Sequence, residues 1–269
     1  MQKFCFLLLS ACCCLSAFSS PVRSNLGGDG EEYVDAAAPT AADYVQDGLV
    51  AMWDAIENVG WGIHSDCAQV WVDLVGGCVT EPKILWSNGE GRDYISVDVE
   101  NVTLLPDSAL GFSNAVWQVE VAFTSRKTGD NNILLTFDTG AYFGIQGGNR
   151  FANVRDGEGR LGWVCSNLKA WVYSDVEVPY SEAVSGVMSM RHDSETKRNN
   201  RYYWNAVYRN YFLYANETKL SGVFYIHVPR LDRPKGVETH YHCIRLYDRF
   251  LTEEEISYNY TIDKMRFGL

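Results

Sequence analysis

Two short acidic pairs come nearest to a catalytic spacing in this chain of 269 residues. A single residue separates Asp98 from Glu100, and a single residue separates Asp175 from Glu177. On a strand, each pair would place two carboxylates on one face, about 6.6 Å apart, between the separations of retaining and inverting glycosidases. Paired acids on the wet face of a strand are far more often hydrated surface groups. The chain also has no GxSxG, HExxH or P-loop motif, so we expect no catalytic activity.

Oxygen-rich turns are the second kind of candidate site, because calcium is bound by carboxylate and carbonyl oxygens. Asp130 lies in a Gly-Asp-Asn-Asn turn, and Asp138 stands shortly before a glycine. We name these two residues as candidate calcium ligands, with the alternative that Asp, Asn and Gly are what turns ordinarily use. His240 and His242 alternate on one strand, but no third ligand accompanies them, so packing or exposure is the preferred interpretation.

Aromatic side chains are the third candidate, since a ring can stack on the face of a sugar. The chain has 8 Trp and 16 Tyr, and they are densest at Tyr202, Tyr203 and Trp204. Successive residues of a strand point to opposite faces, so Tyr203 and Trp204 should point away from each other. We name both as candidate ligand-binding residues, with core packing as the alternative for each ring.

Composition and charge exclude several classes of partner. With 46% hydrophobic residues and only 7 Pro, the chain has a globular composition. It carries 23 basic and 34 acidic residues, a net charge of −11. Binding to nucleic acid needs a surplus of surface cations, so nucleic acid is not an expected partner, and neither is an anionic membrane surface.

The N-terminus predicts export. A basic start is followed by an uncharged apolar run from Phe4 to Phe18, which is too short to span a bilayer and typical of a secretory signal peptide. Small residues at Ala17 and Ser19 favour cleavage after Ser19. Leu-Ser-Ala-Cys at 9–12 also resembles a bacterial lipoprotein signal, in which Cys12 would carry the lipid. We expect a secreted or cell-surface protein, with a lipid anchor at Cys12 as the alternative.

Four cysteines remain after residues 1–19 are removed: Cys67, Cys78, Cys165 and Cys243. In an exported protein they permit three disulfide pairings, between which the sequence does not choose. Four free buried thiols are an equal alternative, because a domain of this size can build a core without disulfides. No CxxC pair is present, which argues against a thiolate zinc site.

The rest of the chain divides into a linker and one domain. Residues 20–42 are rich in Gly, Ala, Ser and acidic side chains and predict a flexible acidic linker. Residues 43–269 form short alternating runs separated by Gly- and Asn-containing turns, which indicates antiparallel sheets in a sandwich or barrel. In 115–124, the even-numbered Gln118 and Glu120 alternate with apolar residues, as in a half-buried strand.

One helix is predicted near the C-terminus, over about residues 253–260. Thr252 and Glu255 have the spacing of a capping box, and Leu251 and Ile256 that of a hydrophobic staple. Glu253 and its neighbours suit the positive end of the helix dipole.

Three segments resemble a known superfamily. They are YVQDGLVAMWD at 44–54, VWVDLVG at 70–76 and IRLYDRFLTEEEI at 244–256, followed by Asn259 and Asp263. They resemble the concanavalin A-like lectin/glucanase superfamily, and within it the laminin-G-like jelly-roll domains of bacterial surface proteins. A looser match lies at 211–216, where Glu217 stands in place of the usual Gly.

The resemblance implies an all-β, two-sheet antiparallel jelly roll, in which calcium often binds at loop ends. Glycosidases of the superfamily need an ExDxxE or ExDxE strand, and this chain has none. We therefore expect an exported, non-catalytic module that binds carbohydrate or a cell-surface ligand. The alternatives are a structural or adhesion domain with a protein partner and, less favoured, a glycoside hydrolase of the same fold.

Overall fold

The computed structural model of the chain describes its helices and strands and some of the segments that connect them. The described residues are 37–57, 71–76, 79–80, 84–87, 94–97, 103–105, 116–127, 131–137, 141–147, 159–165, 170–178, 183–193, 201–211, 224–226 and 237–269. Residues Ala38–Leu269 form one compact unit. The predicted signal peptide at 1–19, Cys12 included, lies outside the described residues.

The larger of the two main sheets contains the first and the last strand of the chain's described part, β1 and β16. Its strands follow the order β14-β13-β12-β7-β16-β5-β4, and β1 pairs with β16 beside that path. All these pairings are antiparallel. The strands are β1 (Leu49–Asp54), β4 (Ile84–Ser87), β5 (Tyr94–Val97), β7 (Val116–Lys127), β12 (Ala183–Asp193), β13 (Arg201–Trp204), β14 (Val207–Tyr211) and β16 (Val237–Tyr247).

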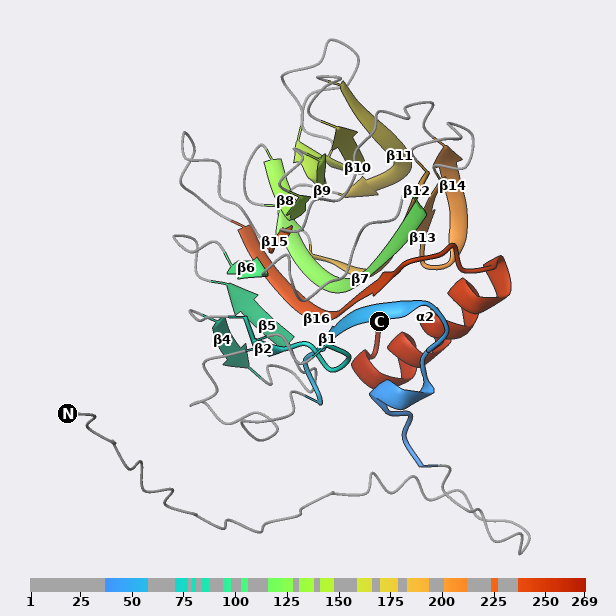
Figure 1. Cartoon of the computed structure of the whole chain (residues 1–269). Helices are drawn as coiled ribbons and strands as arrows, with labels where there is room; N and C mark the ends of the chain where they lie inside the picture. Colours follow the sequence, from blue (N-terminus) through green and yellow to red (C-terminus); the bar gives the residue numbers. More distant parts are fainter. Residues whose placement is uncertain are drawn as a thin grey trace, which may run out of the picture. The chain divides into compact units, whose positions relative to one another are not determined.

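The second sheet has the order β11-β10-β9-β8-β15-β6, also antiparallel throughout. Its strands are β6 (Thr103–Leu105), β8 (Asn131–Phe137), β9 (Ala141–Gly147), β10 (Gly159–Cys165), β11 (Ala170–Val178) and β15 (Phe224–Ile226). A separate pair joins β2 (Trp71–Val72) to β3 (Val79–Thr80). Strands β8 to β11 lie on one side of the curved larger sheet, and the C-terminal helix lies on the other, next to β1 (Figure 1). The predicted all-β, two-sheet antiparallel jelly roll with a C-terminal helix is confirmed.

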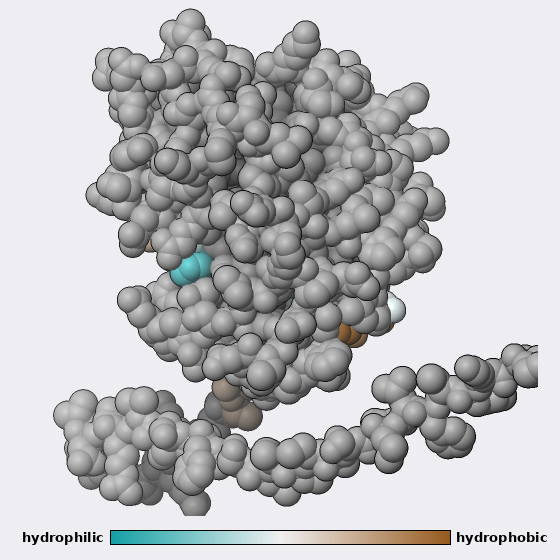
Figure 2. All heavy atoms as spheres, turned by 90° about the vertical axis from the view of Figure 1, so that its left-hand side faces the viewer, coloured by the Kyte–Doolittle hydropathy of each residue, from teal (hydrophilic) through white to brown (hydrophobic). Residues whose placement is uncertain are grey.

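The central strand β7 is buried on both faces. Trp117, Val119 and Val121 are fully buried, as the alternation predicted, but so are Gln118 and Glu120. The expectation of a half-buried strand was therefore wrong, because the C-terminal helix covers the face that carries the polar residues. Few described side chains reach the surface on the side of the molecule shown in Figure 2.

The helix α2 (Glu253–Phe267) is longer than the predicted 253–260. It begins as predicted: the side chain of Thr252 accepts from the backbone of Glu255, and the Glu255 side chain accepts from the backbone N–H of Thr252. It ends at Gly268, whose φ of 65° is left-handed. The prediction stopped early because polar residues, Asn259 and Asp263, occupy the buried face of the second half.

The compact unit begins earlier than the sequence indicated. A 3₁₀ turn, η1 (Ala41–Asp43), is capped at Thr40, and Ala41 is buried in a core cluster with α2 residues. The backbone N–H of Ala41 donates to Oε1 of Glu57 at 2.7 Å. The sequence placed residues up to 42 in the flexible linker, because small residues such as Ala41 give no pattern of burial.

The turn between β13 and β14 is tight and strained. Its two central residues, Asn205 and Ala206, have φ of 51° and 62°, as in the type I′ turns that join antiparallel strands. Asn205 is held by β12, since its backbone N–H donates to the Val187 carbonyl at 2.9 Å and its side chain accepts from the Val187 N–H at 2.8 Å. Gly186 has no side chain, and the side chains of Asn205 and Trp204 occupy the space that a Cβ atom at this position would need.

Replacing Gly186 by Ala is expected to destabilise the domain. The added Cβ would lie 2.6 Å from two ring atoms of Trp204 and would also meet the side-chain oxygen of Asn205. Overpacking of this kind costs about 1–3 kcal/mol. Thermal unfolding of the Gly186→Ala variant should show a lower melting temperature, and an unchanged one would contradict the close packing of Trp204 over residue 186.

Candidate functional site

A buried arginine joins the larger sheet to α2. Arg245, on β16, donates through Nε to Oε2 of Glu120 on β7 at 3.1 Å. Its two terminal nitrogens donate to the two carboxylate oxygens of Asp263 on α2, at 2.7 and 2.6 Å. All three side chains are fully buried. A bidentate pair of this kind fixes both distance and orientation, so Arg245 sets where α2 lies on the sheet.

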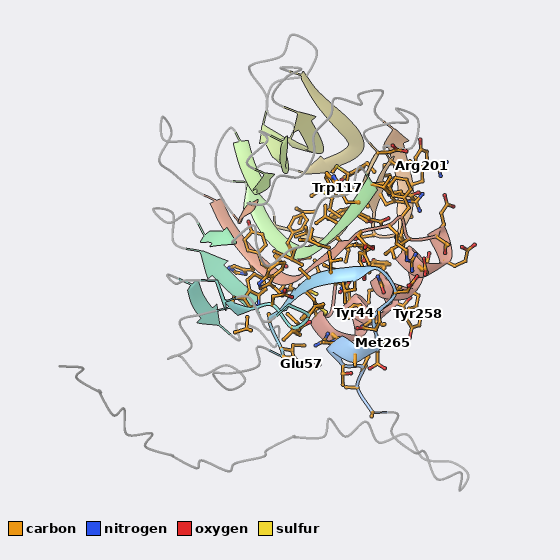
Figure 3. All side chains as sticks on the ribbon, in the orientation of Figure 1. Tyr44, Glu57, Trp117, Arg201, Tyr258 and Met265 are labelled. Atoms are coloured by element: carbon orange, nitrogen blue, oxygen red, sulfur yellow. The ribbon has the colours of Figure 1, made fainter. Side chains whose placement is uncertain are left out.

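Two neighbours extend this cluster to the N-terminal segment. The hydroxyl of Tyr44 donates to Oδ1 of Asp263 at 2.7 Å, and the Arg245 guanidinium lies over the Tyr44 ring at 4.1 Å. Tyr44 lies beside α2 in Figure 3. Asn259 donates to Oε2 of Glu120 at 2.8 Å, and its carbonyl oxygen accepts from the backbone of Val45 at 3.0 Å. The cluster therefore connects four parts of the chain that are far apart in sequence.

The same burial bears on glycosylation at Asn259, one of three N-x-T sequons in the chain. Its amide nitrogen also donates to the hydroxyl of Tyr247 at 3.0 Å, and the residue is fully buried. No glycan can reach Asn259 in the folded protein. The other two sequon residues, Asn101 and Asn216, lie outside the described residues.

The cluster carries one cation and two carboxyl groups. Burial raises the pKa of Glu120, while Arg245 acts to lower it. The Oε1 atom of Glu120 accepts no hydrogen bond within the described part of the chain. Burial acts to lower the pKa of Arg245, but Asp263 and the other acidic neighbours raise it well above its usual value. Arg245 is therefore charged, and Glu120 is the group whose ionisation is costly.

Two further arginines hold the ends of the same helix. Arg266 donates to both carboxylate oxygens of Asp54, at 2.8 and 2.9 Å, and to Glu57 at 3.1 Å. Near the start of α2, Arg249 donates to both oxygens of Glu255, at 2.9 and 2.7 Å. The three segments that resemble the superfamily, at 44–54, 70–76 and 244–256, are called the signature segments below. These contacts give a structural role to charged residues of two of them, since Asp54 ends the first segment and both Arg249 and Glu255 belong to the last.

The remaining signature segment is also structural. The carboxylate of Asp73 accepts from three backbone N–H groups, those of Met52, Val75 and Gly76, at 2.8, 3.0 and 2.9 Å. Asp73 thus fixes the turn after β2 against β1. Within these segments Asp54, Asp73 and Arg245 are buried and bound to protein groups, so they hold the scaffold together.

The structure places the two aromatic candidates inside the fold. Tyr203 and Trp204 point to opposite faces, as predicted: Tyr203 packs with Tyr247 and the residues at the start of α2, and Trp204 packs against Phe123 at a ring distance of 5.8 Å. Only 1% of Tyr203 and 6% of Trp204 is exposed. Neither ring offers a face to a ligand here, and core packing, the alternative left open by the sequence, accounts for both.

The candidate calcium ligands and the acidic pairs cannot be placed, because they lie outside the described residues or have undescribed side chains. Asp130, Asp138, Asp98 and Glu100 are not among the described residues, and the side chains of Asp175 and Glu177 on β11 are not described. Where side chains are described, no group of three His, Cys, Asp or Glu is placed to hold a metal. The calcium prediction therefore stays a prediction.

His242 and Cys243 are both packed against the helix layer. Nε2 of His242 lies 3.0 Å from the hydroxyl of Thr124, and its ring stacks on Phe267 at 5.3 Å. Cys243 is a free, buried thiol, and burial raises its pKa well above the usual value. This removes Cys243 from the possible disulfide pairings. Cys67 and Cys78 lie outside the described residues, and the side chain of Cys165 is not described.

An exposed aromatic ring that the sequence analysis did not single out lies on β14. Tyr208 is 45% exposed and pairs across the hairpin with Tyr203, edge to face at 5.8 Å. The guanidinium of Arg201 lies 5.9 Å from the centre of its ring, and Arg201 also pairs with Glu253 at 3.3 Å. The sequence feature that could have indicated this ring is the turn at Asn205 and Ala206, because a turn there pairs Tyr208 with Tyr203.

Comparison with known proteins gives structural neighbours only. No family model matches the chain, and no curated protein matches it. Among solved structures, Trypanosoma rangeli sialidase in complex with the inhibitor DANA is 15% identical, with a TM-score of 0.53, over 84% of this chain and 34% of the sialidase. The chain thus spans about a third of the sialidase's length.

A second neighbour is matched almost completely. Domain 4 of AbnA, a GH43 extracellular arabinanase from Geobacillus stearothermophilus, was solved in complex with arabinotriose. It is 15% identical over 78% of this chain and 96% of the domain, with a TM-score of 0.51. Botulinum neurotoxin type C, whose cell entry depends on two ganglioside molecules, is 9% identical over 80% of this chain and 51% of that one, with a TM-score of 0.50. At these identities the likeness establishes the fold alone.

Removing the acidic partner of Arg245 is expected to be severe. Asp263→Asn leaves the buried guanidinium without its bidentate carboxylate, and breaking a buried pair in this way costs about 3–5 kcal/mol. The matched control is Glu253→Gln, which breaks the exposed pair with Arg201 and should change stability by no more than about 1 kcal/mol. Chemical denaturation of both variants tests this, and equal losses would contradict a central role for Arg245.

Glu120→Gln is expected to change how stability depends on pH. Because burial raises the pKa of Glu120 above its ordinary 4.5, the folded state holds this proton more tightly than the unfolded chain. Ionisation therefore costs stability as pH rises from about 4.5 through the folded pKa. Glutamine keeps the acceptor for Arg245 and never ionises. The free energy of unfolding of the variant, minus that of the wild type, should grow from pH 4.5 to 7, and a constant difference would be the contrary result.

Proposed function

We propose that this protein is an exported, non-catalytic module that binds carbohydrate or another ligand at a cell surface. The observation that carries the proposal is the fold-level match that covers 96% of arabinanase domain 4, a domain solved in complex with arabinotriose. Two further neighbours support carbohydrate as the class of ligand. The sialidase was solved in complex with the inhibitor DANA, and cell entry of the neurotoxin depends on interaction with two ganglioside molecules. The signature segments support placing the domain among concanavalin A-like, laminin-G-like jelly rolls.

The charges of the described residues support a binding role over catalysis. Glu120, Asp263 and Asp54 are buried and bound to arginines, so they have no access to a substrate. The net charge of −11 argues against strongly anionic partners. None of the described helices is long and apolar enough to cross a membrane. Export itself rests on the predicted signal peptide, with Cys12 as the possible site of a lipid anchor.

One observation favours the alternative of an adhesion domain with a protein partner. Tyr258 and Met265, seven residues apart on α2, are 53% and 67% exposed, and both lie along the outer side of the helix in Figure 3. Exposed large apolar side chains in one region are typical of interaction surfaces. A glycoside hydrolase is less favoured, because the chain has no ExDxxE or ExDxE strand and the carboxylates that lie together on the larger sheet are bound to arginines.

Binding to a glycan array tests the proposal directly. The full chain, purified from an exporting host, should bind a coherent group of glycans in the presence of calcium. Loss of those signals on adding a chelator would place calcium in the site, and unchanged signals would remove Asp130 and Asp138 as functional ligands. A blank array in both arms would contradict glycan binding and put the protein-partner alternative first.

A further inference from the structure

We propose that the β13–β14 hairpin carries the ligand site, with Tyr208 as the stacking ring and the Arg201–Glu253 pair as its polar partner, and that the ligand is an uncharged sugar ring. This inference rests on the proposed carbohydrate-binding function and assigns it a place and a ligand class. We call Arg201, Tyr208 and Glu253 the hairpin site.

The position of Tyr208 on the sheet is the first argument. β14 stands at the end of the strand order of the larger sheet. It exposes two successive side chains, Val207 and Tyr208, one on each face of the strand. Natural proteins keep edge strands short, charged or covered, because an exposed apolar edge invites aggregation. Two exposed apolar side chains at such an edge are therefore a feature that needs a reason, and recognition of a ligand supplies one.

The second argument is that the Tyr208 ring packs on an anchored neighbour. Tyr203 and Tyr208 meet edge to face at 5.8 Å, and the buried guanidinium of Arg191 lies 5.0 Å from the centre of the Tyr203 ring. Arg191 is itself anchored, donating to the backbone carbonyl of Leu251 and to Oε1 of Gln118. A ring that already has such a contact loses less conformational freedom when a ligand arrives.

The third argument is backbone strain at the same hairpin. Ala206 adopts a φ of 62°, a conformation that glycine takes freely and that other residues rarely adopt. Strained backbone persists where the surroundings enforce it, and it is concentrated at ligand sites. Here the strain produces the tight turn that brings Tyr208 opposite Tyr203 and beside Arg201.

The charges around the ring select the class of ligand. Arg201 presents N–H donors and Glu253 presents carboxylate acceptors. The two lie 3.3 Å apart, and the guanidinium of Arg201 lies over one face of the Tyr208 ring, 5.9 Å from its centre. An anionic group would meet Glu253, and a cationic group would meet Arg201. A neutral sugar can place its apolar C–H face on Tyr208 while its hydroxyls donate to Glu253 and accept from Arg201. The hairpin site therefore fits an uncharged sugar better than a sialic or uronic acid.

Tyr208→Ala measured against Tyr258→Ala tests the site. The probes are neutral arabino-, xylo-, manno- and gluco-oligosaccharides, with sialylated and uronic-acid-containing ones beside them, and the full chain is used throughout. Tyr208→Ala should weaken binding to the neutral probes by at least about tenfold, and Tyr208→Phe should retain it because the ring remains. Tyr258, an equally exposed tyrosine on α2 that lies apart from Arg201 in Figure 3, is the matched control and should bind as the wild type does.

Arg201→Ala is the second variant, since it removes an exposed side chain and leaves the packing of Tyr203 in place. It should also weaken binding to the neutral probes, with an unchanged melting temperature. If the wild type binds and both Tyr208→Ala and Arg201→Ala bind equally well, the hairpin site is overturned and the proposed function stands. If the wild type prefers acidic probes, the ligand class is wrong. If it binds no probe at all, the site and the proposed function both fail.

Discussion

Arg245 supplies the positive charge that allows the C-terminal helix to lie on the sheet. Its guanidinium contacts a carboxylate on β7 and another on α2, and both carboxylates are fully buried. Taking three ionisable groups out of water is expensive, so such a cluster adds less to stability than an apolar packing of the same volume would. What it adds is a defined geometry: only one position of α2 satisfies both oxygens of Asp263 and places Asn259 on Glu120.

The same principle recurs at both ends of the helix. Arg266 binds Asp54 at the end of β1, and Arg249 binds Glu255 in the first turn of α2. Each arginine uses two nitrogens on two oxygens, which a lysine could not reproduce. The segments that resemble the laminin-G-like family contribute Asp54, Arg245, Arg249 and Glu255 to these ion pairs. A signature made of such contacts identifies how a helix is docked, and it says little about a ligand, because one fold hosts many functions.

Local patterns predicted much of the fold, and distant contacts account for what was missed. The capping box of α2 and the presence of a strand at β7 depend on neighbours in sequence and were confirmed. The burial of Glu120 depends on Arg245 and Asn259, which are 125 and 139 residues away, and nothing in the strand's own pattern shows that a helix will cover it. Alternation likewise placed Tyr203 and Trp204 on opposite faces, but it carries no information about which faces are covered.

The filled helix layer also restricts where a ligand can act. Because the face of the sheet beneath α2 is occupied by buried ion pairs, the proposed ligand site can lie only outside this layer, as it does at the edge hairpin. Tyr203 contacts both Tyr208 and the cluster of Leu251 and Ile256 at the start of α2. A ligand on Tyr208 would therefore stabilise the hairpin and the helix start together, since any ligand that binds only the folded state raises its stability. The proposed site is therefore coupled to the helix layer through Tyr203.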